Sequence, residues 1–289
     1  MSRKLQIRLE FQAMATDFDF QVVVDSRLLE HAKQTLFEVK SEVQRCETSL
    51  TRFQEESPVA QLNRTYNEWV DADERLIQTL NLSYSLYDFT KSSFNPFRGA
   101  HKDAVEIKGN QARRVNKNCV LDFGAIGKGI ALDRVQILLR REGFEDYLLN
   151  AGGSSLLVSG LDAYRESWKI GWCYRKENER FYGVSFETCD VDRPYAIGIS
   201  GEMEQGKHID GVSSEHEVTS VWVDHASAAV ADALATSLFV ESTQSNSKFS
   251  NLEDQSFQGR DVGRAVLMRD RRLFWSPGFE KWKECSSLG

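Results

Sequence analysis

The stretch Val120-Leu-Asp-Phe-Gly-Ala-Ile-Gly-Lys-Gly129 marks the point where a short apolar strand turns into a helix. Three glycines lie within six residues, and a helical pattern follows from about residue 128 to residue 142. Glycine permits a tight turn and close approach of a ligand to bare backbone N–H groups. The positive end of the helix and the charge of Lys128 would add to an anion cradle. The stretch therefore predicts a strand–turn–helix unit with a possible phosphate site.

This motif has an alternative explanation. It is not a Walker A loop, because no Gly-Lys-Ser or Gly-Lys-Thr ends it, and it does not follow the GxGxxG register. Taken alone, such a stretch is more often a tight strand–helix turn that binds nothing. The phosphate interpretation needs further motifs to support it.

On both sides of this unit, strands and helices are intermixed without regular βαβ spacing, which predicts an α+β fold. Ser57 followed by Pro58 is a typical helix start. Residues 93–119 and 241–259 are polar and are predicted to be loops. The predicted strands are 5–11, 18–24, 146–150, 154–159, 168–172, 218–223 and 264–269, and the predicted helices are 28–50, 74–90, 128–142 and 227–240.

Length and composition set outer limits on the function. With 289 residues, of which 41% are hydrophobic, we expect a single domain over residues 1–289, or two intimately joined lobes. A net charge of −7 argues against nucleic acid as a partner. No apolar run suits a secretory signal or a membrane span, so we expect a cytoplasmic protein without stable membrane insertion.

A second motif, Ala231-Asp232-Ala-Leu-Ala-Thr236, lies on a predicted helix of small residues. Asp232 and Thr236 are four residues apart and therefore share one helix face. A carboxylate and a hydroxyl are hard oxygen ligands of the kind that Mg²⁺ accepts together with water and substrate phosphates. By itself, the pair is more often a solvated charge beside a surface hydroxyl.

Two weaker motifs complete the set. The Asn150-Ala-Gly-Gly153 turn, with Gly152 and Gly153, admits a flat ligand or a phosphate, but it is equally compatible with an ordinary turn. In the stretch from Ser200 to Gly211, His208 lies beside Asp210 after a glycine-containing polar loop. Such a histidine can supply a base near neutral pH, although most are surface residues.

Taken in order, these pieces resemble the FAD:protein FMN transferase (ApbE) family, and the resemblance covers nearly the whole chain. The matching pieces are Met14-Ala-Thr16, Thr51-Arg-Phe53, Ser57 to Asn63, Phe94-Asn-Pro96, Leu121 to Gly129, the Asn150 to Gly153 turn, Trp168 to Gly171, Ser200-Gly201, the His208 element and Ala231 to Thr236.

The resemblance implies a T-fold-like architecture of mixed sheets with flanking helices around an FAD cleft. It implies Mg²⁺ held by Asp232, Thr236 and the backbone oxygen of Gly127, with Lys128 near the phosphates and His208 activating the acceptor. Both Lys128 and His208 would be catalytic. Carried over motif by motif, FAD contacts fall on Met14, Asn63, Phe94, Gly124, Lys128, Asn150, Gly152, Gly153, Ser200, Gly201 and His208.

The implied reaction moves the FMN half of FAD, as substrate, to a threonine hydroxyl and releases AMP. The implied partner is an acceptor redox flavoprotein subunit with a threonine-containing flavinylation motif. The His208-Ile-Asp-Gly211 element is one residue shorter than the family pattern and lacks its proline, and Asn95, Ala125 and Ala15 are also departures. Two alternatives remain open: a Mg²⁺-dependent FAD pyrophosphatase that gives FMN and AMP, and an FAD-binding or flavin-trafficking protein without activity.

Overall fold

The computed structural model describes residues 3–177, 180–188, 193–201, 217–244, 255–268, 270, 272–279 and 282–288. For residues 172–177, 180–188, 244 and 282–288, the description is limited to the backbone. The predicted base, His208, lies outside the described residues.

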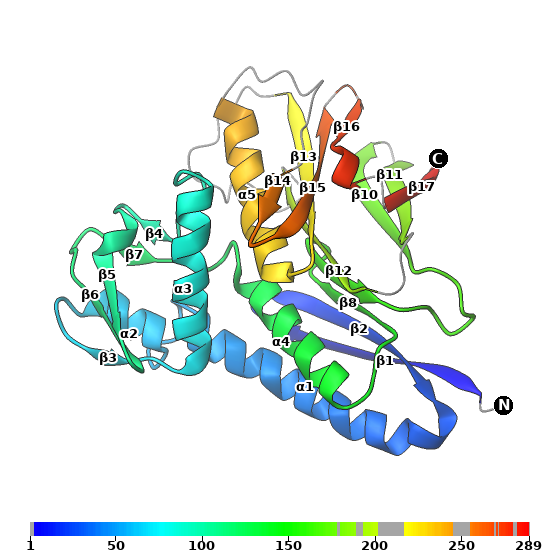
Figure 1. The fold of residues 1–289 in the computed structure, drawn as a ribbon, viewed down its shortest axis with the longest axis horizontal. Helices are drawn as coiled ribbons and strands as arrows, with labels where there is room; N and C mark the ends of the chain where they lie inside the picture. Colours follow the sequence, from blue (N-terminus) through cyan, green and yellow to red (C-terminus); the bar gives the residue numbers. More distant parts are fainter. Residues whose placement is uncertain are drawn as a thin grey trace.

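A large antiparallel sheet forms the centre of the molecule (Figure 1). In the described part of the chain it has nine strands, in the order β1-β2-β8-β9-β12-β13-β15-β14, with β16 paired to β15. Their bounds are β1 Lys4–Ala13, β2 Thr16–Asp25, β8 Tyr147–Ala151, β9 Ser155–Ser159, β12 Tyr195–Gly201, β13 Val218–His225, β14 Gln255–Phe257, β15 Arg260–Met268 and β16 Leu273–Trp275. This sheet, with its helices, confirms the predicted α+β class.

Three helices lie along one face of the sheet, namely α1 (Leu29–Leu50), α4 (Gly127–Arg141) and α5 (Ala228–Gln244) (Figure 1). One buried cluster joins α1 and α4 to strands β2 and β8. Another cluster packs Trp168 and Ile170 against β9, β12, β13 and β15. Ile170 belongs to a second sheet of β10 (Lys169–Glu177), β11 (Arg180–Thr188) and β17 (Trp282–Leu288). The central sheet is therefore buried on both faces.

The segment between α1 and α4 forms a separate cluster of small elements beside the sheet (Figure 1). These elements are α2 (Pro58–Arg64), β3 (Val70–Asp71), α3 (Glu74–Phe89), β4 (Phe97–Arg98), β5 (Val105–Lys108), β6 (Gln111–Arg114) and β7 (Val120–Leu121). Ser57 caps α2 by accepting a hydrogen bond from Ala60 N at 3.0 Å, as predicted. The side chains of this cluster share one core with α5 and β13.

Two predicted loops are corrected by the structure. Residues 93–119 contain strands β4, β5 and β6, and residues 241–259 contain the end of α5 and strand β14. Both segments are polar, but Arg114 is buried with its guanidinium donating to backbone oxygens of Leu62 and Thr65. Polarity misled the prediction because most polar side chains of β5 and β14 point to solvent, while β5, β6 and β14 each bury at least one apolar residue, namely Val105, Ala112 and Phe257.

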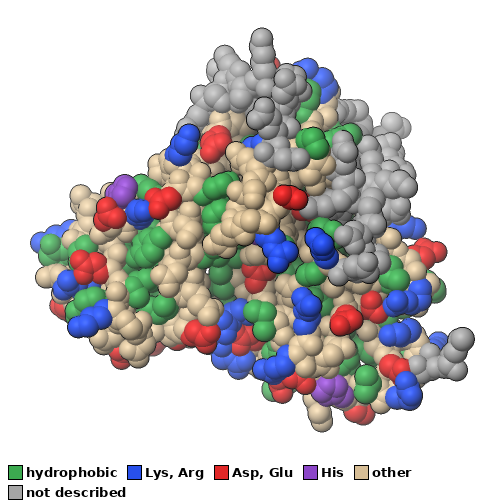
Figure 2. Space-filling model, viewed as in Figure 1, with side chains coloured by type: hydrophobic (Ala, Val, Ile, Leu, Met, Phe, Trp, Pro, Cys, Tyr) green, Lys and Arg blue, Asp and Glu red, His purple; other side chains and the backbone are tan. Residues whose placement is uncertain are grey.

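The surface fits the composition. Figure 2 shows acidic and basic side chains interspersed on this face, with no broad field of one sign. Within the described residues, no helix combines the length and the apolar character that crossing a membrane requires.

Candidate functional site

The candidate site is built where the N-terminal turns of α4 and α5 meet. Gly129 N donates a hydrogen bond to Asp232 Oδ2 at 2.8 Å, and Ser155 Oγ donates to the same oxygen at 2.7 Å. The glycine-rich turn and the Ala231 to Thr236 helix, which are about 100 residues apart in the chain, are therefore in direct contact. Sequence reasoning did not single out Ser155, which lies two residues beyond the Gly-Gly turn.

Small residues make this contact possible. A Cβ at Gly129 would lie 2.3 Å from Ala228 O, and a Cβ at Gly198 would lie 2.3 Å from Ala231 O. Real carbon atoms do not approach a carbonyl oxygen so closely. The first turn of α5 is thus enclosed between α4 and β12, and both glycines are required by packing.

The carboxylate of Asp232 is buried, and burial raises its pKa from 3.8 to about 7. The nearby charge of Lys128 and the hydrogen bonds from Ser155 and Gly129 act in the opposite direction, while the charge of Asp133 raises the pKa further. Removing a carboxylate from water disfavours its ionised form. The hydrogen bonds and charges around Asp232 therefore do not fully offset the cost of burying its negative charge.

Thr236 lies one turn further along α5, and its Oγ1 is 3.3 Å from Ser200 Oγ at the end of β12. Gly201 follows, where a Cβ would lie 2.6 Å from Thr219 O of the neighbouring strand. The structure therefore brings together Thr236 of the Ala231 to Thr236 motif and the Ser200-Gly201 motif, which were predicted separately.

The glycine-rich turn is held by its own aspartate. Asp122 Oδ1 accepts from Gly124 N at 3.0 Å, while Arg98 and Arg52 approach Asp122 Oδ2 at 2.9 Å and 3.3 Å. Gly127 N donates to Phe123 O at 2.8 Å as the helix begins. The two arginines, which the sequence did not single out, bring positive charge to the turn that precedes Lys128.

A second pair of predicted motifs also meets. Met14 and Ala15 both have positive φ angles, 51° and 57°, in the tight turn between β1 and β2. Gly152, with φ of 66°, packs so closely on Thr16 that a Cβ would lie 2.2 Å from Thr16 Oγ1. Asn150 Oδ1 accepts from Gly153 N at 2.8 Å. The opening motif and the Asn150 to Gly153 turn are therefore neighbours.

Two other predicted FAD contacts have their side chains committed to the fold. Asn63 Nδ2 donates to Leu121 O at 2.9 Å, and Asn63 Oδ1 accepts from Leu121 N at 2.8 Å. Phe94 is 2% exposed and lies in the core shared with α5. Their side chains hold β7 and the glycine-rich turn in position. Any contact with FAD in this region would therefore be made by neighbouring atoms and not by these two side chains.

The oxygen atoms of this site suit a hard cation. Asp232 offers a carboxylate oxygen, Oδ1, that accepts no hydrogen bond from the described residues, because both bonds go to Oδ2. Thr236 supplies a hydroxyl next to it on the helix. No group of three or more His, Cys, Asp or Glu gathers within the described residues. A single carboxylate with neutral oxygens fits Mg²⁺ that is shared with water and phosphate.

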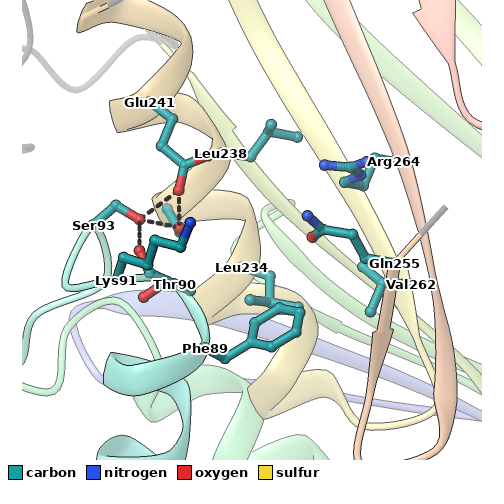
Figure 3. A pocket seen from close by; sticks show the side chains of 11 residues that line it. Phe89, Thr90, Lys91, Ser93, Leu234, Leu238, Glu241, Gln255, Val262 and Arg264 are labelled. Carbon is teal, nitrogen blue, oxygen red and sulfur yellow. Dashed lines mark hydrogen bonds between the residues drawn. The ribbon is translucent and has the colours of Figure 1, made fainter. Parts of the chain in front are cut away.

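The opposite face of α5 lines a cavity of about 480 Å³ (Figure 3). Leu234 and Leu238 of α5 line it, Lys91 and Arg264 lie on opposite sides, and Glu241 accepts from Ser93 Oγ at 2.6 Å. Because residues 234 and 238 point away from residues 232 and 236 on a helix, this cavity is separate from the Asp232 site.

Comparison with known proteins relates the whole fold to one family. The model of the ApbE family matches residues 14–117 and 98–258. FAD:protein FMN transferases of Vibrio cholerae and Salmonella typhimurium are 30% and 27% identical over 148 and 157 residues. These stretches cover 47% and 50% of this chain and 43% of each relative, so the match spans less than half the length of either curated relative.

Solved structures give the same fold. The flavin transferase ApbE from Vibrio cholerae superposes with a TM-score of 0.75 at 17% identity, over 97% of this chain and 100% of that chain. The apo flavinyl transferase ApbE of Pseudomonas stutzeri gives 0.74 at 16% identity, over 96% and 97%. The ApbE protein of Thermotoga maritima gives 0.74 at 19% identity, over 96% and 98%. At these identities the likeness establishes the architecture.

Proposed function

This chain belongs to the ApbE family, and on that premise we propose that it is a Mg²⁺-dependent FAD:protein FMN transferase. Its substrate would be FAD, and its partner would be an acceptor redox flavoprotein with a threonine in a flavinylation motif. The names of the two curated relatives support the activity. The local geometry of the α4–α5 junction supports the roles of individual residues.

The observation that carries the proposal is the contact between Gly129 N and Asp232 Oδ2 at 2.8 Å. It brings a buried carboxylate to the N-terminal end of α4, where backbone N–H groups and Lys128 favour phosphate. A site that combines one cation-binding carboxylate with a phosphate cradle suits a pyrophosphate substrate. Neither half of this pair would indicate FAD without the other.

We assign the cation to Asp232, Thr236 and the carbonyl oxygen of Gly127, and we assign the pyrophosphate to Lys128 and the turn around Gly124. A bound Mg²⁺ would neutralise phosphate charge and polarise the phosphorus–oxygen bonds. Lys128 adds a second positive charge for the phosphate oxygens. We assign another part of FAD to Met14 and to the Gly152-Gly153 turn, which leads to Ser155, the hydrogen-bond partner of Asp232.

In the proposed reaction, the threonine oxygen of the acceptor attacks the phosphorus on the FMN side of FAD. A phosphoester bond forms, the pyrophosphate bond breaks, and AMP leaves with the bridging oxygen. The hydroxyl proton passes to His208, which we retain as the general base. Phosphoryl transfer depends chiefly on in-line placement and charge neutralisation, so few protein groups are required.

The test is a reaction of the purified chain with FAD and Mg²⁺, with and without a small acceptor domain that carries the motif. AMP and covalently bound flavin are followed together. AMP that appears in step with labelled acceptor, and that disappears when EDTA removes the cation, is the expected result. A His208→Ala variant should lose labelling while it still binds FAD.

Other outcomes have defined meanings. Free FMN and AMP in the absence of acceptor would instead identify an FAD pyrophosphatase. Binding of FAD without cleavage under either condition would overturn the transferase and leave an FAD-binding protein.

A further inference from the structure

Helix α5 receives part of its N-terminal cap from a different helix. Asp133 of α4 accepts hydrogen bonds from Ala228 N at 2.7 Å, Ala229 N at 3.1 Å and Ser227 Oγ at 2.6 Å. The first N–H groups of a helix lack partners within the helix, and a negative charge stabilises that end. All three bonds of this half-buried carboxylate go to the start of α5, the helix that carries Asp232 and Thr236.

The exchange between the two helices is reciprocal. Asp232 of α5 accepts from Gly129 N in the first turn of α4, and Asp133 of α4 accepts from the first turn of α5. Asp133 lies four residues after Gly129, and Asp232 lies four residues after Ala228. Each carboxylate is therefore on the face of its helix that meets the other helix. Because a Cβ at Gly129 would meet Ala228 O at 2.3 Å, nothing separates the two backbones there.

Helix formation alone does not require this charge. Ser227 already provides a local cap, since its Oγ accepts from Val230 N at 3.3 Å. Burial raises the pKa of Asp133 from 3.8 to about 6, so its ionised form is held against a desolvation cost. The Asp133 carboxylate additionally fixes the position of α5 relative to α4. These two helices carry the two halves of the candidate site.

We propose that Asp133 is a positioning residue of the cation site, holding the first turn of α5 so that Asp232 and Thr236 face Gly127 and Lys128. This inference rests on the proposed function, because it assumes that the site takes Mg²⁺. Asp133 itself bonds to α5 and acts on the cation only through Asp232 and Thr236. Residues that orient metal ligands from behind typically contribute tenfold to hundredfold in affinity.

The chain offers a matched control at another helix start. Asp73 caps α3, accepting from Leu76 N at 3.0 Å and from Ser49 Oγ at 2.6 Å, the same two donor types that Asp133 receives. Asp73 is exposed and lies outside the α4–α5 junction. Loss of either cap should lower Tm, but only loss of Asp133 should weaken binding of the cation.

The experiment measures the dissociation constant of Mg²⁺ by calorimetry, together with Tm, for the parent chain and for Asp133→Ala, Asp133→Asn, Ser227→Ala and Asp73→Ala. We expect Asp133→Ala to weaken Mg²⁺ binding about tenfold or more, and Asp133→Asn and Ser227→Ala to have smaller effects. Asp73→Ala should lower Tm and leave Mg²⁺ binding unchanged. Amides of residues 228–230 should exchange faster in metal-free Asp133→Ala. If that variant does not fold, Asp133→Asn provides the test.

A dissociation constant in Asp133→Ala equal to that of the parent chain would overturn the inference and leave Asp133 as a structural cap. Equal weakening by Asp133→Ala and Asp73→Ala would overturn it too, since general destabilisation would then explain both. If the parent chain itself binds no Mg²⁺ while it labels acceptor, the cation of the proposed function is wrong and the inference is overturned with it.

Discussion

Two buried carboxylates, Glu42 on α1 and Asp232 on α5, have opposite surroundings, although both helices pack against α4. Glu42 on α1 accepts from Arg75, Arg134 and Arg45, with contacts from 2.5 Å to 3.0 Å, and so joins α1 to α3 and α4. Burial alone would raise the pKa of Glu42, but these hydrogen bonds outweigh it and lower the pKa from 4.5 to about 2. From the described residues, Asp232 receives only a backbone N–H and a hydroxyl, and its pKa rises to about 7.

The difference separates a structural carboxylate from a candidate functional one. A charge surrounded by three guanidinium groups is neutralised within the protein and can bind nothing further. A charge that burial disfavours gains most from a cation that arrives from outside. The comparison therefore supports Asp232 as the ligand and excludes Glu42, although both are acidic residues on helices that pack against α4.

The largest expected effect is on catalysis at Asp232. Asp232→Asn keeps an oxygen that can accept from Gly129 N and Ser155 Oγ but removes the negative charge. We expect FMN transfer to fall by about 100-fold or more, because the cation loses its only carboxylate among the described residues. Initial rates of acceptor labelling at saturating FAD provide the measurement. A variant that retained more than half of the parent rate would contradict the role of Asp232.

The second effect is on stability at Glu42. Glu42→Gln leaves three guanidinium groups around a neutral amide, so we expect a loss of about 3 kcal/mol in the free energy of unfolding. Urea denaturation measures this loss. The Mg²⁺ affinity of the folded variant should stay within about twofold of the parent value, because the described hydrogen bonds of Glu42 go to arginines of α1, α3 and α4 and not to α5. A large loss of Mg²⁺ affinity with little loss of stability would break the comparison.

The smallest effect is on the pH dependence of stability in the metal-free protein. Glu42 has a lowered pKa, so its contribution is present above pH 4.5 and is lost as the pH falls toward 2. Asp232 has a raised pKa, so its ionisation lowers stability as the pH rises from 3.8 through 7. In Asp232→Asn this group no longer ionises, so the free energy of unfolding should fall by roughly 1–2 kcal/mol less between pH 5 and 8 than in the parent chain. The Tm of the variant should decline correspondingly less over that range. Glu42→Gln should alter only the acid limb.

The result of this titration is clear in either direction. A Tm profile of Asp232→Asn that runs parallel to the parent profile from pH 5 to 8 would mean that Asp232 is ionised throughout. The contrast with Glu42 would then be lost, although Asp232 could still serve as a ligand.

Local patterns in the sequence predicted much of the fold. The helices around residues 29–50, 74–89 and 127–141 were confirmed, as was the Ser57 cap, because periodicity and capping are local properties. Strands β4, β5 and β6 were missed within a segment that was interpreted as a loop. They are only two to four residues long. β5 and β6 pair with each other as a hairpin, but β4 pairs with β7 and β6 also pairs with β3, which are more distant in the chain.

The candidate site divides in the same way. The sequence identified Asp232 with Thr236 and the turn around Lys128, since each motif lies within a few residues. It did not identify Ser155, Asp133 or the Arg52 and Arg98 pair, because none of these carries a local pattern. The role of His208 stays a prediction, since that residue lies outside the described part of the chain.

By itself, the sequence determined the kinds of chemistry available to this protein, namely a glycine-rich turn with a lysine and a helical carboxylate–hydroxyl pair. Spacing along one helix or turn is enough to fix such local groups. Only the tertiary structure decided that the two motifs meet at Gly129 and Asp232, and that Glu42 is neutralised while Asp232 is not. Burial and the distance to the nearest arginine depend on segments about 30 to 100 residues apart, so no local pattern records them.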